Sequence, residues 1–205
     1  NFIIVLIIPA LIAWLLSNRW PKYGLAIFGS LYLVFVILFF TARYINPRFD
    51  FPQAVVNKQQ EFINLKGGSS IPISQLKPDA ISFLINTPQA ITLSSIRPYP
   101  SDVKHLLSLA AAVEVIALLL MFALFLIWPK NGLRSKNLIY FCIFFSVSVL
   151  LAIGFSVNNL GAIVRYRSII LPLLVIPMAA LIDWRRLGNL LTSNIRNKNN
   201  IIKNA

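Results

Sequence analysis

The sequence predicts an all-α protein, an integral membrane helical bundle of about five transmembrane helices, with a short outward-facing helical segment between helices 2 and 3. Of its 205 residues, 58% are hydrophobic and only 12% are charged, about half the charged share of a soluble domain. The mean hydropathy is +0.75, and a soluble domain of this length could not bury so much apolar surface. Five apolar runs approach or meet the roughly 20 residues that a helix needs to cross a bilayer.

The first two runs, Phe2 to Leu16 and Tyr23 to Ala42, predict a transmembrane hairpin over residues 1–42. No basic segment precedes the first run and no small-residue cleavage site follows it, so it is a poor signal peptide. We therefore expect the chain to be the C-terminal part of a longer multi-pass protein.

Residues 43–104 predict an extracytoplasmic segment with short amphipathic helices. Helices are expected at Pro52 to Leu65, ended by Gly67, at Lys77 to Asn86 and at Pro88 to Ile96. The last two look interfacial, because polar residues interrupt their apolar positions. They either lie on the outer leaflet and cap the bundle, or form a lid over a groove that admits a lipid-linked substrate.

Residues 105–184 predict three more transmembrane helices, within His105 to Trp128, Leu138 to Val157 and Ser168 to Ile182. The last run is only 15 residues long and spans only about 22 Å as a helix, less than a bilayer core. Its outer end should therefore reach back into Arg165-Tyr166-Arg167, after a break near Asn158 to Gly161. Residues 185–205 predict a basic cytoplasmic tail.

The positive charge follows the predicted topology. Nineteen Lys and Arg against six Asp and Glu give a net charge of +13. Basic residues in the segments 17–22 and 129–137 and after Asp183 fall on one side of a five-helix bundle, and that side is then cytoplasmic. We expect membrane lipids rather than nucleic acid as partners. A single cysteine, Cys142, and a single histidine, His105, argue against disulfides and metal sites, and no cofactor is expected.

Glu114 is the acidic residue inside a predicted transmembrane helix. It lies nine residues after His105, roughly 14 Å along the helix and near the bilayer middle, where an ionised carboxylate costs at least a few kcal/mol. It should face protein or water on the small-residue side of its helix, which Ala110, Ala111 and Ala117 form. It either contacts substrate or carries a proton, or it forms a structural ion pair or hydrogen bond between two helices.

Three arginines are candidate phosphate ligands, because a guanidinium can bind phosphate with two hydrogen bonds. Arg97 precedes Pro98-Tyr99-Pro100, a stiff extended segment that would fix its place, with Asp102 or Lys104 nearby. If Arg165 and Arg167 are helical, their side chains point about 200° apart, so one can face lipid while the other faces the bundle. The alternatives are a solvated Arg97 and two arginines that snorkel to the headgroups.

Two motifs resemble a known group of proteins. They are Asn86-Thr87-Pro88-Gln89-Ala90-Ile91 leading into Arg97-Pro98-Tyr99-Pro100, with Glu114 in the next helix, and the run from Asn159 to Arg167 followed by Pro172. Residues 86–180 resemble the C-terminal half of bacterial inner-membrane polysaccharide-assembly proteins, which are similar to O-antigen polymerases and lipid-carrier-dependent glycosyltransferases. The resemblance implies that Arg165, Arg167 and Arg97 contact the phosphates of a polyprenyl-pyrophosphate-linked glycan. It also implies other envelope-assembly membrane proteins as partners.

Three functions follow as hypotheses. The first is an envelope glycan polymerase or transferase that uses a lipid-linked sugar at the outer face of the inner membrane. The second is a transporter or flippase subunit, in which Glu114 couples transport to protons and Pro172 and Pro177 mark a broken helix. The third is a non-catalytic membrane partner, in which these charges serve packing and anchoring.

Overall fold

The computed structural model describes residues 2–65, 69–103, 106–130 and 136–189. Within these residues every regular element is a helix, and two isolated β-bridges join loops, which confirms the predicted all-α class. The elements in chain order are α1 (Phe2–Arg19), η1 (Pro21–Tyr23), α2 (Gly24–Ile45), η2 (Pro47–Phe49), α3 (Phe51–Asn64), α4 (Ala80–Ser95), η3 (Pro100–Asp102), α5 (Leu106–Ile127), α6 (Lys136–Ser156), α7 (Leu160–Arg167) and α8 (Leu171–Leu181).

Several helices have the length and composition of membrane spans. Three helices in the described residues, α2 with η1, α5 and α6, are long and apolar enough to cross a bilayer. Helices α7 and α8 pass the same test together as one span broken by a 58° bend, and α1 is a shorter apolar helix. The five predicted runs are therefore three long helices, one bent pair and one shorter helix. By length and composition, these helices are candidate spans of a multi-pass membrane protein.

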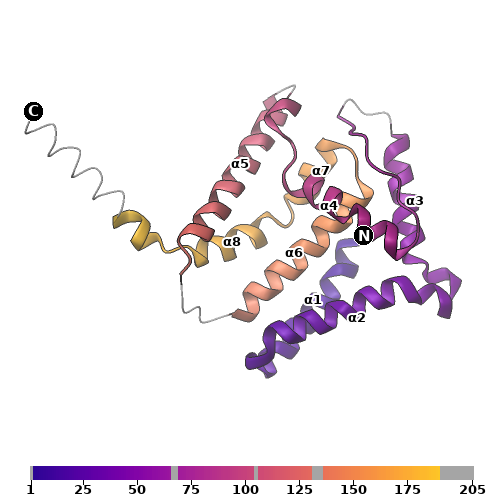
Figure 1. Ribbon diagram of the computed structural model, residues 1–205, viewed down its shortest axis with the longest axis horizontal. Coiled ribbons are helices and arrows are strands. Elements are labelled where there is room, and N and C mark those ends of the chain that lie inside the picture. Colours follow the sequence, from indigo (N-terminus) through magenta and orange to yellow (C-terminus); the bar gives the residue numbers. More distant parts are fainter. Residues whose placement is uncertain (1, 66–68, 104–105, 131–135, 190–205) are drawn as a thin grey trace, which may run out of the picture.

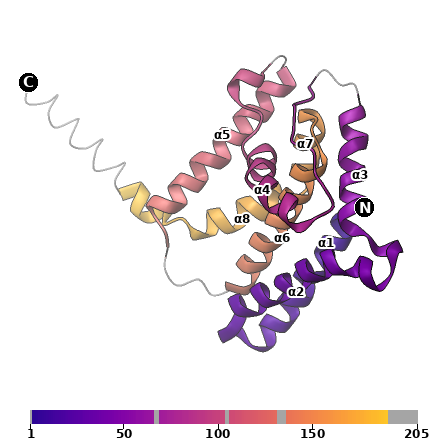
Figure 2. The ribbon, with the colours of Figure 1, turned by 45° about the vertical axis from the view of Figure 1, so that its right-hand side comes forward.

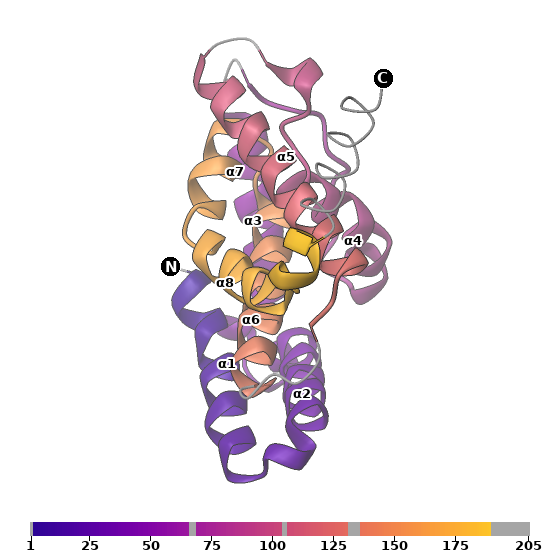
Figure 3. The same cartoon turned by 90° about the vertical axis from the view of Figure 1, so that its left-hand side faces the viewer.

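Helix α6 is the centre of the bundle. It packs against α1, α2, α3, α4, α7 and α8, and it crosses the middle of the molecule between the α1–α2 hairpin and the α5–α8 pair (Figure 1). Figure 2 shows α3 standing beside this bundle with α4 and α7 near its centre. Seen from the side, the hairpin turn lies at one end of the long molecule and the start of α5 at the other (Figure 3).

Close packing joins α4 to α6. A side chain at Gly154 of α6 would run into the backbone of Ala90 in α4, so the glycine allows the two backbones to touch. Leu93 of α4 belongs to the same buried cluster as Val149 and Ile153 of α6. The segment between the second and third spans is therefore packed along α6.

The prediction of two short helices at 77–86 and 88–96 was wrong. They form one helix, α4, capped by the carboxylate of Asp79, which accepts from the Ser82 backbone N–H, with Pro88 in its interior. Proline removes one backbone hydrogen bond and usually breaks a helix. Here the bond lost at Pro88 is the one to the Leu84 carbonyl, and the packing of the helix on α6 compensates for it.

The prediction for α3 is confirmed to within a residue: it begins at Phe51 rather than at Pro52, and it ends at Asn64. Asp50 caps it by accepting from the Gln53 backbone N–H. Gly67, the expected helix stop, lies outside the described residues.

Backbone contacts hold the loop after α3 against the junction of α6 and α7. The Ile71 N–H donates to the carbonyl of Asn158 at 2.8 Å, and the Leu160 N–H donates to Ser69 at 3.1 Å. The break predicted near Asn158 is thus present, and it is stabilised by residues from the segment between the spans. This junction positions α7 and its arginines.

Candidate functional site

The site is centred on Arg167, at the end of α7, whose residue surface is only 1% exposed. Its Nε and Nη2 donate to Oε1 of Glu114 at 3.2 and 3.0 Å. Its Nη1 donates to the carbonyl of Arg97 at 2.8 Å and to that of Ser94 at 3.3 Å. One guanidinium therefore connects α7 to α5, to the end of α4 and to the segment that follows α4.

The helix N-cap fixes where Arg167 points. Asn159 caps α7 by accepting from the backbone N–H groups of Gly161 and Ala162, and it also accepts from the hydroxyl of Ser69. From this start the helix turns Arg167 into the bundle and leaves Arg165 exposed. The sequence prediction that the two arginines face opposite ways in a helix is confirmed.

Glu114 lies on the buried side of α5. Of the three small residues predicted on its inward face, Ala111 is buried, but the prediction was wrong for Ala110 and Ala117, which are exposed. The other buried neighbours are Ala112 and Val115. Its own side chain is 30% exposed. The carboxylate thus neutralises the buried guanidinium of Arg167, because a buried ion without a partner would cost several kcal/mol. The structure places Glu114 in an ion pair between helices, one of the two interpretations left open by the sequence.

The side chain of Arg97 contacts residues of its own segment. It is 27% exposed, and its guanidinium lies 3.8 Å from Oδ2 of Asp102 and 5.0 Å from the ring centroid of Tyr99. Asp102 in turn accepts from the Tyr99 backbone N–H at 2.9 Å. Asp102 is the partner that the sequence suggested, while Lys104 lies outside the described residues.

A pocket of about 290 Å³ opens beside the Arg97 side chain. Its apolar wall comes from the loop before α4 and from α4 itself. Gln89, Thr92 and Tyr99 supply polar groups, and Arg97 supplies the positive charge; the full lining is Ile71, Pro72, Ile73, Pro88, Gln89, Thr92, Leu93, Arg97 and Tyr99. The arrangement presents one cation and several hydrogen-bonding groups to a small anion.

Arg165 lies outside this cluster. Its guanidinium sits 5.3 Å from the ring centroid of Tyr166, and Tyr166 lines a different and larger cavity, of about 440 Å³. Of the four predicted site residues, Glu114 and Arg167 are paired through their side chains, and Arg97 joins them only through its backbone carbonyl. Arg165 is not part of this group. Among the described residues, no group of three or more His, Cys, Asp or Glu could hold a metal ion.

Sequence reasoning missed two residues of the larger cavity. Lys58 of α3 lines it together with Tyr166, and the sequence predicted no binding role for either residue. Lys58 lies in a polar stretch of the chain, and nothing in its spacing distinguishes it from a solvated lysine.

Comparisons with known proteins complete the description of the site. No protein-family model matches the chain, and neither a curated protein nor a solved structure does.

Proposed function

We propose that this chain is the membrane-embedded part of a bacterial inner-membrane protein of cell-envelope polysaccharide synthesis, and that it binds the phosphates of a lipid-pyrophosphate-linked glycan at the outer face of the membrane. The observation that carries the proposal is the placement of Arg97. Its guanidinium borders a pocket of about 290 Å³ while its own carbonyl is held by the buried Arg167. A fixed, partly exposed guanidinium is well suited to bind a phosphate oxygen.

The charged residues then have different roles. Arg97 is the substrate-binding residue, with Gln89 and Thr92 as polar neighbours in the pocket. Arg167 and Glu114 are positioning residues, because the guanidinium of Arg167 already makes four hydrogen bonds to protein. Fixing a binding group in advance removes the entropic cost of ordering it when the ligand arrives.

The sidedness of the proposal follows from the basic segments. Arg19 and Lys22 lie at the turn between α1 and α2, and Arg185 and Arg186 follow α8. In membrane proteins, the short loops on the cytoplasmic side carry an excess of Lys and Arg. The C-terminus is then cytoplasmic, and the loop that carries Arg97 faces outward, where a lipid-linked glycan is extended.

A cellular experiment tests the proposal. In the bacterium that carries the protein, Arg97→Ala in the full-length chain should shorten or abolish the envelope glycan, while Arg97→Lys should retain part of its length. Arg48→Ala is the matched control, because Arg48 is an exposed arginine of the same segment. Glycan of normal length with Arg97→Ala, at a normal protein level in the membrane, would contradict the proposal.

The bent pair α7–α8 favours a second candidate, a transporter or flippase subunit. A span broken by 58° resembles the discontinuous helices that form transporter sites, and the Glu114–Arg167 pair joins this span to α5. Proton-dependent uptake that is lost in Glu114→Gln, with normal glycan, would support this candidate over the first.

A further inference from the structure

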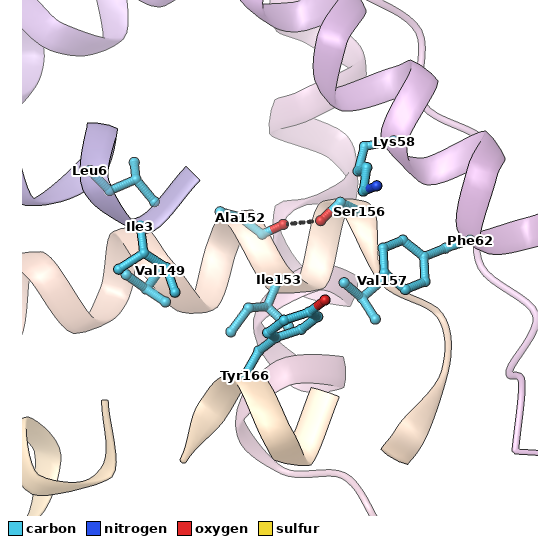
Figure 4. A pocket seen from close by; sticks show the side chains of 10 residues that line it. All are labelled: Ile3, Leu6, Lys58, Phe62, Val149, Ala152, Ile153, Ser156, Val157 and Tyr166. Carbon is cyan, nitrogen blue, oxygen red and sulfur yellow. Dashed lines mark hydrogen bonds between the residues drawn. The ribbon is translucent and has the colours of Figure 1, made fainter. Parts of the chain in front are cut away.

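A cavity of about 440 Å³ lies where α1, α3 and α7 diverge around the C-terminal half of α6. Most of its wall is apolar, with Ile3 and Leu6 from α1, Phe62 from α3 and Val149, Ile153 and Val157 from α6 and its end. Figure 4 shows the ring of Phe62, from α3, and the ring of Tyr166, from α7, both near Val157 at the end of α6. Its volume is within the range of about 300–1,000 Å³ typical of ligand pockets.

Three of the residues that line this cavity have polar side chains: Lys58, Ser156 and Tyr166. The hydroxyl of Ser156 already donates to the carbonyl of Ala152 (Figure 4). Lys58 projects its ammonium group toward the end of α6 (Figure 4), and this group also contacts Oε2 of Glu61 at 2.6 Å.

A second cation is linked to the cavity through Tyr166. Arg165 is exposed, and its guanidinium packs over the ring of Tyr166, one of the lining residues. The cavity thus has one cation, Lys58, in its wall and another, Arg165, on the ring of a lining residue, in a protein whose long helices have the composition of membrane spans. Apolar walls favour a hydrocarbon chain, and the cations favour an anionic headgroup.

We propose that this cavity binds one acyl chain of an anionic phospholipid, with the lipid phosphate held between Lys58 and Arg165 and the Tyr166 hydroxyl donating to a headgroup oxygen. A free phosphate would leave the apolar walls unused, and a neutral lipid would leave the two cations unused. The site shares no lining residue with the pocket beside Arg97, so this proposal does not depend on the glycan function.

Glu61 makes the proposal unusually easy to test. Its side chain is 63% exposed and competes with the lipid phosphate for the ammonium group of Lys58. Removing the Glu61 charge should therefore strengthen binding of an anionic lipid, whereas a general loss of structure would weaken it.

The test is native mass spectrometry of the purified full-length protein with phosphatidylglycerol or phosphatidylcholine. Phosphatidylglycerol should be retained preferentially, about five-fold more weakly in Lys58→Gln and in Arg165→Gln and more strongly in Glu61→Gln. Ala152→Phe should fill the cavity and abolish the preference. Ala123→Phe is its matched control, because Ala123 is an exposed alanine of α5.

Three results would overturn the proposal. They are equal retention of the two phospholipids, a preference that survives Ala152→Phe, and displacement of phosphatidylglycerol by a stoichiometric amount of a prenyl monophosphate, which would assign the cavity to a different lipid. Melting curves of the variants in detergent identify any that fail to fold. Glu61→Gln keeps the proposal testable in that case, because its predicted effect is a gain of binding.

Discussion

Arg167 donates two hydrogen bonds to a single carboxylate oxygen of Glu114, across 53 residues of sequence. The same guanidinium holds the carbonyls of Ser94 and Arg97. Three parts of the chain that are remote in sequence therefore meet at one buried charge. The consequence for function is that the position of the Arg97 side chain depends on a pair of residues that need not touch any ligand.

Removal of the carboxylate should destabilise the bundle strongly. Glu114→Ala leaves the buried guanidinium of Arg167 without its counter-charge, and breaking such a buried pair costs about 3–5 kcal/mol. Thermal unfolding in detergent should show a large loss of stability. Glu61→Ala is the control: it breaks the exposed pair with Lys58 and should cost about 1 kcal/mol or less. Equal melting temperatures for the two variants would contradict this role of Glu114.

Replacing both members of the pair should cost less than replacing one. Arg167→Met alone leaves the carboxylate of Glu114 unpaired, whereas Arg167→Met with Glu114→Leu removes both charges. Buried pairs exchanged for apolar residues of similar size are often neutral in stability, although the carbonyls of Ser94 and Arg97 lose a donor here. A double-mutant cycle on unfolding should give a coupling of at least about 1 kcal/mol. Additive effects would mean that the two charges do not interact.

The contact between α4 and α6 predicts that alanine destabilises the protein at Gly154 but not at Gly29. Gly154→Ala places a methyl group against the backbone of Ala90, so the helices must separate, and overpacking of this kind costs roughly 1–3 kcal/mol or more. Gly29→Ala meets nothing within 4 Å and should be neutral or slightly stabilising, because alanine favours helix. Unfolding curves of the two variants measure the difference. A Gly154→Ala protein as stable as the Gly29→Ala protein would refute the close packing.

Gln59 should be important for holding α3 to the end of α6. Its buried amide donates to the carbonyls of Ser74 and Phe155 and accepts from the Leu76 backbone N–H. Gln59→Leu leaves these groups unsatisfied at about 1–3 kcal/mol for a buried group. Hydrogen exchange at Leu76 should accelerate. Gln53→Leu, which removes only an exposed side-chain bond to Asn57, should leave that amide protected.

The sequence predicted those features that depend on local pattern. The apolar runs, the break near Asn158 and the opposite directions of Arg165 and Arg167 follow from helix length and helix periodicity. The need for a partner at Glu114 follows from the cost of burying a charge. Each of these features depends on residues that are close together in the sequence.

Features that depend on tertiary contact could not be predicted in this way. Pro88 normally ends a helix, yet α4 continues through it because the helix packs on α6 at Gly154. Nothing in the local pattern identifies Arg167 as the partner of Glu114. The cavity at Lys58 exists because α1, α3 and α7 diverge around α6, and a single chain segment carries no signature of such a gap.

The most direct test of the account is the affinity of the purified full-length protein for farnesyl diphosphate, measured by isothermal titration calorimetry. If Arg97 binds phosphate, Arg97→Ala should weaken binding about ten- to hundred-fold, because a hydrogen bond to a charged group contributes about 1.5–3 kcal/mol. Arg48→Ala should bind like the unaltered protein. Equal affinity for the unaltered protein and Arg97→Ala, with both folded, would contradict the central claim.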